Sequence, residues 1–175
     1  MPEALSATHL QRPIDRSAPS NQPSTMRRLI LLAALVLAAA ASARADERGR
    51  DVKVVMETYI GLWNAHDAVA ITSNIYRFDA PNPMCDEAGL AAEFARLKGQ
   101  GYDHSVISGV EACVIGPDQA MAELRYSRLK VDGTPLPPKD RATLYLLRHF
   151  PDGWRITRLI PLSATAKVSC KSAAD

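Results

Sequence analysis

The chain has 175 residues, with 21 Lys and Arg against 19 Asp and Glu, and a formal net charge of +2 at pH 7. A charge so close to zero, without a clustered basic stretch, excludes the basic footprint of a nucleic-acid-binding protein and a polybasic membrane patch. Once the N-terminal segments described next are set aside, the length suits one domain.

Residues 26–45 have the pattern of a cleaved secretory signal peptide. Residues 26–28 (MRR) are positively charged, residues 29–43 are uncharged and mostly apolar, and Ala43-Arg44-Ala45 places small residues where a signal peptidase inspects the chain. The apolar run is shorter than the span of about 20 residues that a membrane-crossing helix needs, which favours cleavage over anchoring. We therefore expect a mature chain that begins at Asp46 and is periplasmic or secreted.

Residues 1–25 are rich in Pro, Ser, Gln and Asn and too poor in apolar side chains to bury a core. We interpret them as a non-native or disordered extension, with Met26 as the true initiator. Removal of residues 1–45 leaves 16 basic and 17 acidic residues, so the expected mature net charge is −1.

All three cysteines, Cys85, Cys113 and Cys170, lie in the expected mature part. An oxidising compartment allows one disulfide and leaves one thiol over, and the spacing does not show which two pair. The sequence contains no C-x-x-C pair, metal-ligand spacing, P-loop or dinucleotide fingerprint, so we expect neither a metal site nor a cofactor.

Three helices are predicted in the first half of the mature chain. Apolar residues recur at helical spacing along one face of the first, at Val52, Val55, Met56, Tyr59, Ile60 and Trp63. Asp67 can cap a second short helix that runs to about Tyr76, and residues 77–80 read as a short strand. Asp86 can cap a third helix, which ends at Gly99 or Gly101. Its apolar face is formed by Leu90, Phe94 and Leu97.

Four strands are predicted to follow. Residues 104–115 and 120–131 form two long strands, and residues 140–150 and 154–162 form a hairpin. Residues 132–139, with three prolines and a glycine, form an exposed loop. Helices followed by a meander of strands indicate an α+β fold with an antiparallel sheet. Residues 163–175 are small and polar and are predicted to form a flexible tail.

The last hairpin predicts which side chains face the helices. Pro151-Asp152-Gly153 suits a three-residue loop, which places Phe150 opposite Trp154. In this register one face is apolar except for Arg148 and Arg158, and we expect that face to point inward. A register slip of one residue would reverse the two faces.

The sequence resembles the nuclear transport factor 2-like superfamily, in its polyketide cyclase-like and ketosteroid isomerase-like branch. Residues 59–67 (YIGLWNAHD), residues 152–156 (DGWRI) and the order of helices and strands carry the resemblance, which covers about Asp51 to Leu162. It implies a cone-shaped α+β domain over residues 46–162, with three N-terminal helices in the concave face of a curved, mainly antiparallel sheet. It also implies a pocket between the first helix and the sheet, and a homodimer formed through the outer sheet face.

The isomerase branch uses three catalytic groups, and the resemblance places only one of them here. Tyr59 stands at the position of the oxyanion-hole tyrosine. The aspartate base corresponds to Ala80, and the second acid, which is kept protonated, corresponds to Leu146. Asp79 is one residue before the base position and should face the other way by strand alternation. We therefore do not expect the steroid isomerase mechanism.

Two sets of residues are candidates for a site. A catalytic set would use Tyr59 for charge stabilisation and Asp79 or His104 as the base. A ligand-binding set would consist of Tyr59, Trp63, Tyr126, Arg148 and Arg158, with the arginines holding a carboxylate or similar anion.

Structural roles compete with each of these assignments. Tyr59 and Trp63 can be core residues of an amphipathic helix. His104 can be a structural residue, and the arginines can pair with Asp79 or another acid.

Two functions remain open. The first is an exported domain that binds a small molecule without catalysis. The second is a cofactor-free lyase or isomerase, dehydratase- or cyclase-like, acting on a small apolar substrate with a carbonyl or carboxylate group. Because the position of the isomerase's general base is occupied by Ala80, the sequence favours the binding function over the catalytic one. The expected partner is a small molecule, with no nucleic acid and no membrane after cleavage.

Overall fold

The computed structural model describes residue 44 and residues 47–83 and 85–168. The predicted extension and nearly all of the predicted signal peptide, residues 1–43 and 45, lie outside the described residues. In the described part of the chain, no helix combines the length and apolar character required to cross a bilayer.

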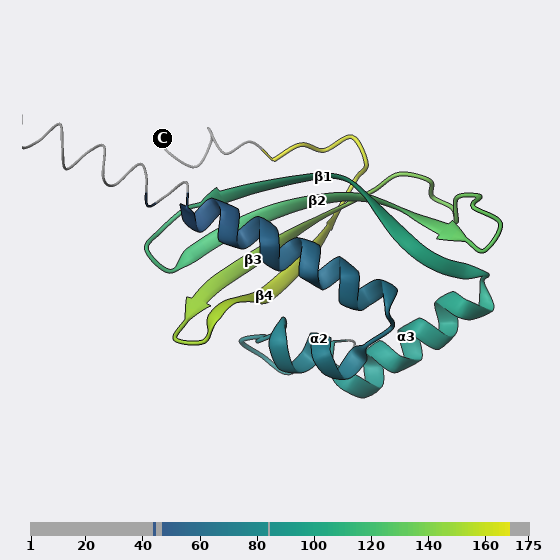
Figure 1. Cartoon of the computed structure of the whole chain (residues 1–175), viewed down its shortest axis with the longest axis horizontal. Helices are drawn as coiled ribbons and strands as arrows, with labels where there is room; N and C mark the ends of the chain where they lie inside the picture. Colours follow the sequence, from purple (N-terminus) through teal and green to yellow (C-terminus); the bar gives the residue numbers. More distant parts are fainter. Residues whose placement is uncertain (1–43, 45–46, 84, 169–175) are drawn as a thin grey trace, which may run out of the picture. The chain divides into compact units, whose positions relative to one another are not determined.

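The first helix, residues 47–64, carries its predicted apolar face into the core (dark blue in Figure 1). The buried side chains are Val52, Met56, Tyr59, Ile60 and Trp63, and Val55 packs partly against them. Helix α2, Ala68–Asn74, begins at Asp67, whose carboxylate accepts a hydrogen bond of 2.8 Å from the Ala70 backbone N–H. This cap confirms the predicted start of the second helix.

Helix α3, Glu87–Gly99, also begins at its predicted cap. The Asp86 carboxylate accepts a 2.7 Å hydrogen bond from the Gly89 N–H, and the helix ends before Gly101, which has a φ of 83°. Its buried face consists of Leu90, Phe94 and Leu97, as the spacing predicts.

The strands β1, Tyr102–Val114, β2, Gln119–Lys130, β3, Arg141–Phe150, and β4, Gly153–Leu162, form one antiparallel sheet in the order β1-β2-β3-β4. Figure 1 shows the curved strands with the first helix lying along one face, and residues of helices and strands share one hydrophobic core. The predicted α+β fold is confirmed. Bulges in β1 and between β3 and β4 contribute to the bending of the sheet.

The predicted strand over residues 77–80 is wrong. Only Tyr76 forms a bridge, parallel to Ile156 on β4, with the backbones of Ile75 and Arg77 bonded to that same residue. The chain then leaves the sheet edge toward Pro81, which has no backbone N–H to continue a ladder.

The predicted register of the last hairpin is wrong at the turn. Phe150 pairs with Gly153, so His149 rather than Phe150 lies opposite Trp154. Trp154 is buried as predicted, but the one-residue difference brings other residues of β3 to the inner face. The inward residues of β3 are Thr143, Tyr145 and Leu147. Arg148 and Arg158 therefore lie on the outer face.

The alternation in β1 is also interrupted. A bulge between Tyr102 and His104 places Ser105 inward and leaves His104 half-exposed. A second bulge between Ile107 and Gly109 restores the predicted face, so that Val110 packs against the core.

Residues 163–168, the C-terminal segment and first part of the predicted flexible tail, form hydrogen bonds with side chains on the outer face of β2. The Arg125 guanidinium donates to the carbonyl oxygens of Ala164, at 2.7 Å, and of Ala166. The Glu123 carboxylate accepts a 2.5 Å hydrogen bond from the Val168 N–H. In Figure 1 this segment continues from β4 past β2 and β1. Residues 169–175 lie outside the described residues.

Cys113 is disulfide-bonded, and Cys85 is a free thiol. These two states agree with the expected combination of one disulfide and one remaining thiol.

Candidate functional site

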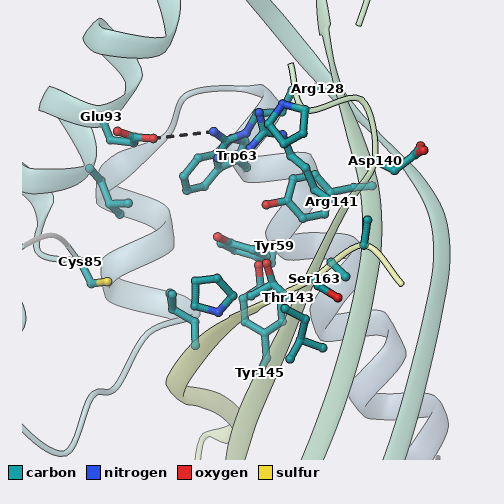
Figure 2. A pocket seen from close by; sticks show the side chains of 18 of the residues that line it. Tyr59, Trp63, Cys85, Glu93, Arg128, Asp140, Arg141, Thr143, Tyr145 and Ser163 are labelled. Atoms are coloured by element: carbon teal, nitrogen blue, oxygen red, sulfur yellow. Dashed lines mark ion pairs between the residues drawn. The ribbon is translucent and has the colours of Figure 1, made fainter. Parts of the chain in front are cut away.

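A cavity of about 520 Å³ lies between the first helix, α3 and the inner face of the sheet (Figure 2). Its volume is within the range typical of small-molecule sites. Aromatic side chains from four parts of the chain form much of its wall, namely Tyr59, Trp63, Tyr76, Tyr126 and Tyr145. Aliphatic side chains complete the apolar surface, among them Leu90, Leu159 and Leu162. The C-terminal segment contributes Ser163 and Ala164 at the edge.

Three buried tyrosines form one wall of the cavity. The Tyr76 hydroxyl donates a 2.8 Å hydrogen bond to the Tyr59 hydroxyl oxygen, and the rings of Tyr59 and Tyr145 meet edge to face at 5.5 Å. Burial raises the pKa of all three hydroxyls well above the ordinary tyrosine value, because a phenolate loses its hydration there. They are therefore neutral hydrogen-bonding groups at physiological pH.

Arg128 lies at one end of the cavity, against the face of Trp63. Its guanidinium carbon is 5.5 Å from the centroid of the Trp63 ring, and the side chain is only 12% exposed. The neighbouring acid is Glu93, whose Oε1 is 3.8 Å from the Arg128 Nη1 (Figure 2). This distance is longer than a charge-assisted hydrogen bond, so the ion pair is loose.

Glu93 is engaged more closely by Arg96 than by Arg128. Two hydrogen bonds of 2.7 Å join its carboxylate oxygens to Nε and Nη2 of Arg96. These bonds lower the pKa of Glu93 below its ordinary value, and the charge of Arg128 acts in the same direction. Glu93 therefore stays ionised and is poorly suited to accept a proton in catalysis.

Arg141 lies at the same end of the cavity as Arg128. Its Nη2 donates a 2.8 Å hydrogen bond to the carbonyl oxygen of Pro137. Burial, followed by repulsion from Arg128, lowers its pKa below the ordinary arginine value. In Figure 2 the carboxylate of Asp140 is directed away from this pair. The end of the cavity is thus electropositive.

The structure brings together three of the predicted site residues. Tyr59, Trp63 and Tyr126 all line the cavity, from the first helix and from the inner face of β2. Tyr59 and Trp63 are buried in the core, as their structural role predicts, and they also form part of the cavity wall, while their role in ligand binding stays a prediction.

The other predicted site residues lie elsewhere. The Asp79 side chain is 64% exposed and pairs with Arg148 at 3.7 Å, which is the structural role that competed with ligand binding. Arg158 lies beside Asp79 in a separate shallow hollow. His104 is bonded to Asp103 through Nδ1 at 2.7 Å. Neither predicted base, Asp79 or His104, lines the cavity with Tyr59.

Several lining residues were missed from the sequence. They are Tyr76, Glu93, Arg128, Arg141 and Tyr145. Strand alternation could have predicted one of them, because Arg128 is two residues beyond the inward Tyr126 on β2 and therefore faces the same side. Arg141 pairs directly with Tyr126 across β2 and β3, but this requires the correct register.

No metal site emerges from the described residues, in which no three His, Cys, Asp or Glu side chains gather to hold an ion. Cys85 lines the cavity as a single thiol. Burial, and to a smaller extent the charge of Asp86, raises its pKa, so it is protonated at neutral pH.

Comparisons with known proteins identify the fold. Residues 81–164 match the family model of an NTF2-like protein (DUF6841). An NTF2-like protein with a cystatin-like fold from Novosphingobium aromaticivorans is 20% identical, with a TM-score of 0.55 over 78% of this chain and 95% of that chain. An NTF2-like superfamily protein from Salmonella enterica is 14% identical, with a TM-score of 0.50 over 71% and 95%.

A ketosteroid isomerase-like protein from Erwinia carotovora is 18% identical, with a TM-score of 0.46 over 67% of this chain and 98% of that chain. No curated protein matches the chain. The chain has the NTF2-like fold, which confirms the resemblance at the level of architecture. Identities this low do not transfer an activity, because this fold supports many functions.

Proposed function

We propose that this NTF2-like domain binds a small, mostly apolar molecule in the cavity between the first helix and the sheet. The observation that carries the proposal is the cavity of about 520 Å³ with its aromatic wall. A ligand there would gain apolar burial and ring contacts, while the hydroxyls of the tyrosine wall would orient a polar group. The signal-peptide pattern adds an extracytoplasmic location to this proposal.

The titratable groups of the cavity favour binding over proton abstraction. Glu93 is held by Arg96 with a lowered pKa, and the wall tyrosines have raised pKa values. A general base works best with a pKa near the operating pH, and neither kind of group meets that condition.

The proposal can be tested with N-phenyl-1-naphthylamine, a neutral apolar dye that fluoresces when it leaves water. We expect the dye and a panel of small aromatic compounds to bind the purified protein and raise its Tm, since ligands of the folded state stabilise it. Ser163→Trp should weaken dye binding by narrowing the cavity edge. Ser108→Trp, an exposed position on β1, is the matched control. Absence of binding by the dye and the whole panel would contradict the proposal.

A second candidate is a cofactor-free lyase or isomerase, and the hydrogen-bonded Tyr76–Tyr59 pair favours it. Two neutral hydroxyls in a buried wall can stabilise a developing oxyanion. The test is deuterium exchange next to the carbonyl of 2-tetralone in D2O. Exchange that is accelerated by the protein and reduced in Tyr59→Phe would support catalysis, and exchange at the uncatalysed rate would reject it for this class of substrate.

A further inference from the structure

Two arginines at one end of the cavity have incomplete partners. Among the residues that the structure describes, the buried Nε atoms of both Arg128 and Arg141 have no hydrogen-bond partner. Buried polar groups are normally paired, so unpaired donors on two neighbouring cations are unusual. Both side chains also line the cavity, which makes their charge available to a ligand.

The acids nearby do not neutralise this pair. Glu93 makes its short bonds to Arg96 and stands 3.8 Å from Arg128. Arg141 donates to an uncharged carbonyl, that of Pro137. Asp140 is directed away. Two guanidinium groups therefore face one carboxylate that a third arginine already holds.

Stacking explains only part of the arrangement. The Arg128 guanidinium lies over the rings of Trp63 and Tyr102, at 5.5 and 5.9 Å, which stabilises the cation through its face. Hydrogen bonds to a guanidinium are made through its edge, and stacking leaves the edge donors unsatisfied. A group with acceptor oxygens in the cavity would meet the charge of the two cations and, at Arg128, terminal guanidinium nitrogens for which the described residues provide only the loose 3.8 Å contact of Glu93.

We infer that Arg128 and Arg141 bind a carboxylate, and that the ligand of this domain is an apolar molecule with one carboxylate at its end. This inference rests on the proposed function, because the rest of the ligand would occupy the aromatic cavity. A planar carboxylate matches the edge of a guanidinium in a two-point contact. A doubly charged phosphate fits less well, because the walls are apolar and Glu93 would repel the second charge.

The test compares 2-naphthoate with 2-naphthamide, which share one ring system and differ in charge. Each compound is titrated into the protein with bound N-phenyl-1-naphthylamine, and the ratio of their half-displacing concentrations measures recognition of the anion. We expect naphthoate to displace the dye at a concentration lower by about tenfold or more, the effect of one or two charge-assisted hydrogen bonds. Added salt should reduce this ratio.

Variants assign the effect to the two arginines. Arg128→Met and Arg141→Met should each bring the ratio toward one. Because both compounds meet the same altered cavity wall, the ratio isolates the response to the charge. Arg158→Met is the matched control, because it removes the same charge from outside the cavity. Arg128→Lys keeps the charge beside Trp63 and should leave an intermediate ratio, which provides a second measurement if Arg128→Met does not fold.

The results of these titrations distinguish a failure of the carboxylate site from a failure of the proposed binding function. A ratio near one in the unchanged protein, with the dye still bound, overturns the carboxylate site and leaves the binding function standing. A large ratio that survives both Arg128→Met and Arg141→Met also overturns it. If neither the dye nor either naphthalene compound binds, the proposed function fails and the carboxylate site fails with it.

Discussion

The Tyr76 hydroxyl donates a 2.8 Å hydrogen bond to the hydroxyl oxygen of Tyr59, and so joins the segment after α2 to the first helix at the wall of the cavity. Both rings are buried, and they lie 5.7 Å apart. The contact is therefore part of the core and also presents polar atoms to a ligand. Loss of this hydrogen bond should therefore have one effect on folding stability and a separate effect on ligand binding.

Tyr76→Phe and Tyr59→Phe should each destabilise the protein by about 1–3 kcal/mol, because each leaves a buried hydroxyl without its partner. The double variant should cost less than the sum, since it removes both groups at once. Denaturant unfolding of the four proteins measures this coupling. Strictly additive losses would show that the two hydroxyls do not depend on each other.

The same tyrosines predict a loss of stability in alkali. Burial raises the pKa of Tyr59, Tyr76 and Tyr145 in the folded state, whereas the unfolded chain has the ordinary value of about 10. The unfolded state therefore releases protons first as the pH rises, and the free energy of unfolding falls above about pH 10. Below about pH 10 the buried, neutral tyrosine hydroxyls make their full contribution to the free energy of unfolding.

Absorbance at 295 nm, which reports phenolate, should rise together with the loss of the folded circular dichroism signal. Tyr145→Phe should make the decline of Tm with pH less steep above about pH 10. Ionisation of all the tyrosines well before unfolding would contradict this prediction.

The helices could be predicted from the sequence because their signals are local. Asp67 and Asp86 cap the residues that immediately follow them, and the apolar face of the first helix follows from spacing alone. The cavity wall contributed by that helix, Tyr59 and Trp63, was found for the same reason.

The arginines of the site could not be assigned because they depend on pairing between strands. One residue of register at Phe150–Gly153 decides whether Arg148 or Leu147 faces inward, and the local pattern is compatible with both. Arg141 reaches the cavity beside Tyr126 only through the β2–β3 register. The sequence predicted arginines on the inner face at Arg148 and Arg158, whereas the arginines that line the cavity are Arg128 and Arg141.

Glu123→Gln should release the C-terminal segment from the sheet. The Glu123 side chain is only 5% exposed and is bonded to both Arg125 and the Val168 N–H, so loss of its charge weakens two contacts. We expect faster tryptic cleavage at Lys167 and a loss of about 1–3 kcal/mol in unfolding free energy. Glu111→Gln, on the exposed position opposite Glu123, is the control. Equal cleavage rates in the two variants would show that Glu123 does not hold the segment.

The signal-peptide pattern predicts that the protein recovered from the cell envelope begins at Asp46. Intact-mass and N-terminal sequence analysis of that material would measure this directly. Ala43→Arg places a large charged residue where the peptidase requires a small one, and should leave uncleaved precursor. Recovery of a cytosolic protein that begins at residue 1 would reject both the export and the start at Met26.

The outer sheet face is predicted to form a homodimer, and the structure narrows the surface available for it. The C-terminal segment bonds to Glu123 and Arg125 of β2, whereas on β3 Leu144 and Leu146 are only partly buried and on β4 Ile160 is exposed. Ile160→Glu should therefore convert a dimer to a monomer in light-scattering measurements, because it places a charge among these apolar side chains. Val131→Glu, in the exposed turn after β2, should leave the dimer intact. A monomeric unchanged protein at high concentration, or a dimer insensitive to Ile160→Glu, would place the contact elsewhere or exclude it.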